Sequence, residues 1–138
     1  MNNPASPNGE QLNRSNALKT IIFVYNADSG IFNILTDAAH KLLSPETYSC
    51  NLCSITYSAA GMKKEWKDFI STLPLPAEFL HRDELQKKYG IQDVALPAVF
   101  IKKDREMSLI ASADSINSCK TVSDLEKLVK MRLQHSIM

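Results

Sequence analysis

The sequence lacks three features that would each assign it to a broad class: an excess of one charge, a long apolar run and a dense set of cysteines. Its 16 Lys and Arg residues nearly balance its 15 Asp and Glu residues, giving a formal net charge of +1. A balanced chain has no strong electrostatic attraction to nucleic acid or to an anionic membrane, so we expect neither as a partner. The apolar run Thr20–Tyr25 is far shorter than the ~20 residues of a membrane-spanning helix.

Disulfide and export signals are also scarce. The three cysteines are too few, and odd in number, for the disulfide framework of a small secreted domain. Residues 1–17 are rich in Asn and carry neither the basic nor the apolar region of a secretory signal peptide. We therefore predict a cytoplasmic protein with a disordered tail over residues 1–17 and one domain over residues 18–138, which is long enough to fold without a metal or a disulfide.

Signature motifs of common enzyme classes are absent as well. No Walker A loop, GxGxxG motif or GxSxG motif occurs, so nucleotide binding and acyl transfer have no support from the sequence. His81-Arg82-Asp83 differs from the catalytic loop of protein kinases, because no Asn follows at the required spacing. Whether the protein is an enzyme is left open by these motifs.

Apolar periodicity predicts alternating strands and helices. The predicted strands cover residues 18–25, 48–57, 78–80, 98–101 and 107–111, the last two forming a hairpin. The predicted helices cover residues 30–43, 63–72 and 81–89, and a last helix starts at residue 121. Residues 59–62 and 112–120 are predicted to be loops. The order β-α-β-α-β-α-β-β-α indicates an α/β fold whose central mixed sheet has helices on both faces.

Two segments in the second half of the chain resemble the C-terminal half of thioredoxins. They are Lys88-Tyr-Gly-Ile91 at a helix end, and Leu96-Pro97-Ala-Val-Phe-Ile-Lys102 at the start of an apolar strand. The resemblance extends to the hairpin and the final helix, and it accommodates residues 18–135 with an insertion around residues 58–80. It implies a thioredoxin-like fold in which Pro97 is cis and faces the turn at 26–30.

The chain departs from thioredoxins at the redox motif. Thioredoxins carry Cys-x-x-Cys where the first core strand meets its helix, so that the helix dipole lowers the pKa of the nucleophilic thiol. Ser29-Gly-Ile-Phe32 stands at that place, and neither Ser nor Phe exchanges disulfides. The sequence therefore predicts a thioredoxin-like protein without the redox motif at its customary position.

A Cys-x-x-Cys pair does occur elsewhere, as Cys50-Asn-Leu-Cys53 on the predicted strand 48–57. Our leading hypothesis is a thiol-redox or redox-sensing role in which Cys50 and Cys53 form a reversible disulfide. The competing interpretation is that both are small buried hydrophobic residues, because positions three apart on a strand face opposite sides. A third hypothesis is a zinc site of Cys50, Cys53 and His81, with His40 as a further ligand. Its support is weak because no second pair of ligands follows.

A ligand groove is predicted between the turn at Asp28, Ser29 and Gly30 and the proline strand at Pro97, with Arg82 beside it. A helix that begins there has free N–H groups, and Arg82 can bind a carboxylate or phosphate. The alternatives are that Asp28 or Ser29 caps the helix and that Arg82 is solvated. The competing function is thus a non-catalytic module that binds a peptide or a small acid in this groove.

Overall fold

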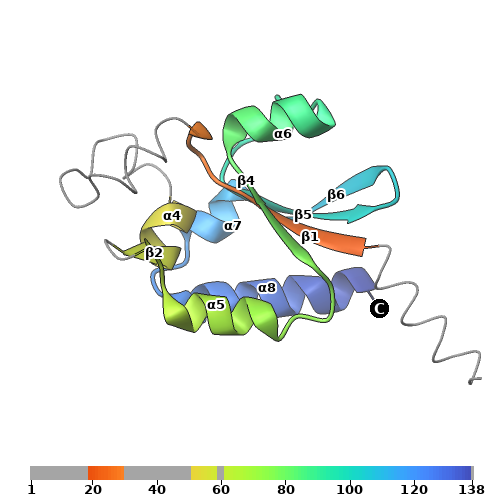
Figure 1. The fold of residues 1–138 in the computed structure, drawn as a ribbon. Helices are drawn as coiled ribbons and strands as arrows, with labels where there is room; N and C mark the ends of the chain where they lie inside the picture. Colours follow the sequence, from red (N-terminus) through yellow and green to blue (C-terminus); the bar gives the residue numbers. More distant parts are fainter. Residues whose placement is uncertain (1–18, 30–50, 59–60, 138) are drawn as a thin grey trace, which may run out of the picture.

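The computed structural model describes residues 19–29, 51–58 and 61–137, whose elements are labelled in Figure 1. The strands are β1 (Lys19–Val24), β2 (Tyr57–Ser58), β3 (Gly61–Met62), β4 (Ala77–Leu80), β5 (Ala98–Lys103) and β6 (Glu106–Ala111). The helices are α4 (Asn51–Thr56), α5 (Lys64–Ser71), α6 (Arg82–Tyr89), α7 (Ala113–Asn117) and α8 (Val122–Ile137). The predicted tail at 1–17 and the predicted helix at 30–43 lie outside the described residues.

Strand β1 lies inside a mixed four-stranded sheet with the order β4-β1-β5-β6. It runs parallel to β4 and antiparallel to β5, and β5 forms a hairpin with β6. The parallel pair needs a crossover between its strands, whereas the hairpin needs only the turn at Asp104 and Arg105. The predicted mixed sheet and its C-terminal hairpin are confirmed.

Both faces of the sheet are buried, which explains the continuous apolar run of β1. Alternate residues of the run enter two cores: Ile21 and Phe23 pack on one side, Ile22 and Val24 on the other. Helices α5 and α8 lie along the first face, and α6 lies on the second (Figure 1). The helices on both faces agree with the sequence prediction.

An aromatic group fills the larger core. The Trp66 ring of α5 is fully buried, meets the Phe23 ring edge-on at 5.4 Å between centroids, and stacks on Phe69 at 5.4 Å. Such pairs contribute roughly 0.5–1.5 kcal/mol beyond the burial of their area. The periodic stripe of α5 thus belongs to the core.

None of the helices in the described ranges combines the length and apolar character needed to cross a membrane.

The ends of α6 and α8 follow from their capping residues. Gly90 ends α6 in the left-handed conformation, with φ 70°, and its N–H donates to the Gln86 carbonyl. At the start of α8, the Asp124 N–H donates to Thr121 Oγ1 at 3.1 Å. The Asp124 carboxylate accepts in turn from the Lys120 N–H at 3.0 Å, one residue before the capping Thr121, so the arrangement is a variant of the capping box with Asp in place of Glu or Gln.

The predicted strand at 48–57 is wrong over residues 51–56, which form helix α4, while residues 48–50 lie outside the described residues. Its buried residues are Leu52, Cys53, Ile55 and Thr56, a spacing that matches one helix face rather than the alternation of a strand. The Thr56 hydroxyl donates to the Leu52 carbonyl at 2.6 Å, which satisfies this buried polar group within the helix. The Asn51 side chain donates to the carbonyls of Ile116 and Cys119, each at 2.9 Å, and so fixes α4 to the segment around α7.

Two other segments differ from the sequence prediction. Gly61–Met62, expected in a loop, pairs with β2 in a small second sheet. Helix α7 occupies part of the segment 112–120 that was predicted to be a loop, and Ser112 caps it by accepting from the Ser115 N–H at 3.3 Å. Strand β4 agrees with the strand predicted at 78–80, and it pairs with β1 in the central sheet.

The outer strand β6 contains an irregularity. Its pairing with β5 shifts between Val99 and Phe100, which leaves Ile110 as an extra residue on β6. Arg132 of α8 donates from Nη1 to the Ile110 carbonyl at 2.8 Å, and from Nη2 to Ser115 Oγ at 3.2 Å. One side chain therefore joins α8, α7 and the irregular edge of the sheet.

Replacing Gly90 by Ala should lower the free energy of unfolding by about 1 kcal/mol, because an L-residue with a Cβ disfavours the left-handed conformation. The added Cβ meets no atom within 4 Å, so the loss reports the backbone conformation alone. Urea unfolding measures it, with Lys87→Ala on the same exposed helix as the control. Gly90→Asn should lose less than Gly90→Ala, and an alanine variant as stable as the wild type would contradict the assignment.

Candidate functional site

The carboxyl ends of the parallel strands β1 and β4 lie at the same edge of the sheet, where Val24 pairs with Leu80. The loops that follow them are hydrogen-bonded to each other. The Tyr25 N–H donates to the Leu80 carbonyl at 2.9 Å, and the Arg82 N–H donates to the Ala27 carbonyl at 3.0 Å. In open α/β sheets, ligands bind outside the carboxyl ends of the strands, so this edge is the candidate binding site.

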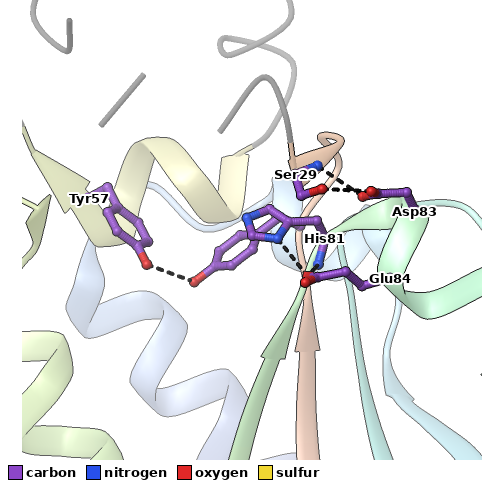
Figure 2. A network of polar contacts seen from close by, with 6 residues as sticks. Ser29, Tyr57, His81, Asp83 and Glu84 are labelled. Atoms are coloured by element: carbon purple, nitrogen blue, oxygen red, sulfur yellow. Dashed lines mark hydrogen bonds and ion pairs between the residues drawn. The ribbon is translucent and has the colours of Figure 1, made fainter. Parts of the chain in front are cut away.

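Ser29 and Asp83 face each other at this edge (Figure 2). The Ser29 hydroxyl donates to Asp83 Oδ2 at 2.6 Å, and the Ser29 N–H donates to Oδ1 at 2.9 Å. The hydroxyl bond is the main reason that the pKa of Asp83 lies below its ordinary value; partial burial opposes it, and the Ser29 N–H lowers it further. The first turn of α6 is thereby joined to the loop after β1.

Arg82 bridges two side chains of the same loop. Its Nε donates to Asp28 Oδ1 at 3.0 Å, and its Nη1 donates to Asn26 Oδ1 at 3.1 Å. The side chains of Arg82 and Asp28 are each 49% exposed, so solvent screens the pair and its contribution to stability is at most about 1 kcal/mol. The pair sets the direction of the guanidinium more than it stabilises the fold.

His81 pairs with Glu84 of the same first turn (Figure 2). His81 Nδ1 lies 2.6 Å from Glu84 Oε1, which also accepts from the His81 N–H at 2.8 Å. Burial opposes the charge on Glu84, but these bonds outweigh it and lower the pKa of Glu84. An ionised carboxylate only accepts hydrogen bonds, so the contact places a proton on His81 Nδ1.

Two tyrosines continue the polar group toward α4. The Tyr25 hydroxyl donates to the Tyr57 hydroxyl at 3.5 Å, and the Tyr25 ring lies 5.6 Å from the His81 ring between centroids. Burial raises the pKa of Tyr57 above its ordinary value; the bond from Tyr25 opposes this, and Cys53 adds to it. The Tyr57 phenol therefore stays neutral at physiological pH and acts as a hydrogen-bonding group.

Pro97 lies at the same edge. The Leu96–Pro97 bond is cis, which confirms the predicted isomer. Ala98 pairs with Val24, so the register places Pro97 beside the residue that follows β1. Of the predicted groove, Arg82 contacts Asp28, and Ser29 contacts the neighbouring Asp83, while Pro97 lies across β1 from them and Gly30 lies outside the described residues.

Two of the three cysteines, Cys53 and Cys119, lie in the described part of the chain, and both are buried. Cys53 lies in α4 rather than on a strand and is only 4% exposed within the larger core. Cys119, which the sequence placed in a polar loop, is also buried, and burial together with Asp124 raises the pKa of its thiol. Cys50 lies outside the described residues, so its pairing with Cys53 stays a prediction.

Two of the predicted zinc ligands, Cys53 and His81, lie in the described part of the chain. No group of three or more His, Cys, Asp or Glu side chains there is arranged to hold a metal ion. His81 uses Nδ1 on Glu84, as metal-bound histidines often do, but Cys50 and His40 lie outside the described residues. The zinc hypothesis therefore stays a prediction.

Several residues of the site were not identified from the sequence. Asp83 and Glu84 were interpreted only as first-turn residues of a helix, and Tyr25 and Tyr57 only as strand residues. One signal was present: the run His81–Glu84 directly follows a strand that is parallel to β1, and carboxyl ends of parallel strands share an edge. The partners across this edge depend on the tertiary fold.

A scan against protein-family models, a search of curated proteins and a search of solved structures found no match. No relative therefore supplies a function for the site. Its function has to be argued from its own geometry and chemistry.

Ser29→Ala should raise the pKa of Asp83 toward the ordinary range, because the shorter of its two hydrogen bonds is lost. Since the native pKa lies below the unfolded one, the bond stabilises the fold at neutral pH, and this advantage fades as the pH falls through the lowered pKa. NMR titration of the carboxyl carbon measures the shift. Ser71→Ala is the control, since that hydroxyl bonds within its own helix. An Asp83 that titrates identically in Ser29→Ala would contradict the assignment.

Proposed function

We propose that this chain is a thioredoxin-like binding module that binds an extended peptide segment at the carboxyl end of β1. The fold proposal is supported by the order of elements in the second half of the chain. The helix capped by Gly90, the cis Pro97, the strand β5, the hairpin and the final helix follow in the order that the resemblance requires. The function proposal rests on the side chains at the edge.

One observation carries the function proposal: a serine hydroxyl fills the position where the resemblance expects the nucleophilic cysteine. Ser29 donates to Asp83 at 2.6 Å, so its proton is shared with a carboxylate whose pKa lies below its ordinary value, which makes that carboxylate a weak base. The only cysteines in the described part of the chain, Cys53 and Cys119, are buried. Exposed thiolates are the reactive ones, so this arrangement favours binding over thiol chemistry.

The segment before Pro97 offers the backbone that an extended peptide needs. Within the described residues, the backbone of Leu96 makes no hydrogen bond to another backbone group. A peptide that lies along Leu96 can therefore pair with it as an added strand does, and main-chain bonds of this kind supply affinity without a specific sequence.

Arg82 adds a side-chain contact for the same ligand. Its Nε and Nη1 are used on Asp28 and Asn26, whereas Nη2 has no hydrogen bond within the described part of the chain. The half-exposed guanidinium is already oriented, so little conformational entropy is lost when Nη2 binds a peptide carbonyl or carboxylate.

Selection from a random peptide library displayed on phage tests this proposal. Selected peptides should shift the amide signals of Ser29, Arg82 and Leu96 in NMR spectra of the labelled protein. Arg82→Gln should weaken binding at least about tenfold, since a hydrogen bond to a charged group contributes about 1.5–3 kcal/mol. Arg105→Gln, at the remote hairpin turn, is the matched control. Failure to select peptides, or peptides whose shifts cluster elsewhere, would overturn the proposal.

The thiols provide a separate test against the redox hypothesis. In the native protein, Cys53 and Cys119 should react with iodoacetamide only after unfolding, because both are buried and burial raises the pKa of Cys119. Mass spectrometry of tryptic peptides measures the labelling of each cysteine, with the urea-unfolded chain as the control. A Cys50–Cys53 disulfide that forms under mild oxidation and is reduced again would instead support thiol-redox function.

A further inference from the structure

A pocket lies at the opposite end of the central sheet from the candidate site, where β1 begins and β5 ends. Its volume is about 280 Å³, and it is lined by Lys19, Ile101, Lys103, Glu106, Ser108 and Ser136. Five of these residues come from β1, β5 and β6, and Ser136 comes from the last turn of α8. None of the residues of the proposed peptide site lines this pocket.

Strand register places two positive charges side by side at this end. Lys19 pairs with Lys103 across β1 and β5, and Lys103 pairs with Glu106 across β5 and β6. Alternation along the strands puts both lysines on the same face as Ile21 and Ile101, which pack in the larger core. Like charges directly opposite each other on a sheet repel, so an anion bound between the two lysines would be attracted by both.

Among the described residues, neither Lys19 nor Lys103 forms an ion pair, although Glu106 lies opposite Lys103 in the strand register. Ser108 and Ser136 add hydroxyl groups that can donate to an oxyanion, and Ile101 contributes an apolar wall. Four donor groups and one acceptor carboxylate, that of Glu106, therefore line the pocket.

The carboxylate of Glu106 restricts which anion fits. An oxyanion without a proton would place its own lone pairs against this carboxylate. An oxyanion that keeps a proton at neutral pH can accept hydrogen bonds from the lysines and donate one to Glu106. We propose that this pocket is a binding site for inorganic hydrogen phosphate and that it discriminates against sulfate, which has no proton to donate.

Thermal unfolding in phosphate, sulfate and chloride buffers of equal ionic strength tests the proposal. A ligand that binds only the native state raises the melting temperature as its concentration increases. Phosphate should raise it more than sulfate or chloride in the wild type. Lys19→Met and Lys103→Met should each lose the phosphate effect, with an at least tenfold weaker Kd by calorimetry. Lys102→Met is the matched control, since Lys102 is adjacent to Lys103 but faces the other side of the sheet.

Glu106→Gln tests the origin of the selectivity. The Gln amide can donate to sulfate, so the variant should bind sulfate and phosphate with affinities within about threefold of each other, whereas the wild type should prefer phosphate by tenfold or more. Equal stabilisation of the wild type by phosphate and sulfate would overturn the proposal. So would a phosphate response that persists in Lys103→Met. NMR shifts at Ser108 and Ser136 in labelled Lys103→Met decide the case if the Lys19 variant fails to fold.

Discussion

The burial of β1 on both faces is the constraint on which the rest of the structure depends. Ile21, Ile22, Phe23 and Val24 are each 0% exposed, and the strand pairs with β4 on one side and β5 on the other. Each of these side chains contributes about 1.5–3 kcal/mol when fully buried, so the strand joins the two cores that α5, α6 and α8 cover. Because its middle is inaccessible, chemistry is confined to its two ends, and polar side chains gather at both.

The carboxyl end is organised by the first turn of α6. Asp83 and Glu84 are adjacent in sequence, yet Asp83 bonds to the loop after β1 and Glu84 bonds to His81 at the end of β4. Both carboxylates also lie at the positive end of the helix dipole, which favours their ionised forms. This turn therefore holds two parallel strand ends in a fixed relation, which is the preorganisation that a binding edge needs.

The sequence predicted the elements whose signals are local. The apolar run of β1, the stripe of α5, the glycine that ends α6 and the β5–β6 hairpin each depend on neighbouring residues, and the structure contains all of them. The segment 51–56 was misassigned because Ile55 and Thr56 favour strands, whereas burial against α7 selects a helix. The bond between Ser29 and Asp83 spans 54 residues, and no local pattern predicts a contact at that separation.

The irregularity at Ile110 has a consequence for how copies of this chain meet. An outer strand with evenly spaced N–H and C=O groups can template another strand and so lead to aggregation. On β6 the extra residue breaks that spacing, and Arg132 already binds the Ile110 carbonyl. For a second copy of the chain to add a strand at this edge, the hydrogen bond from Arg132 to the Ile110 carbonyl would have to break. The irregular pairing at Ile110 would also have to become regular. The hairpin can therefore protrude into solvent, with Leu109 48% exposed, without offering a regular edge for self-association.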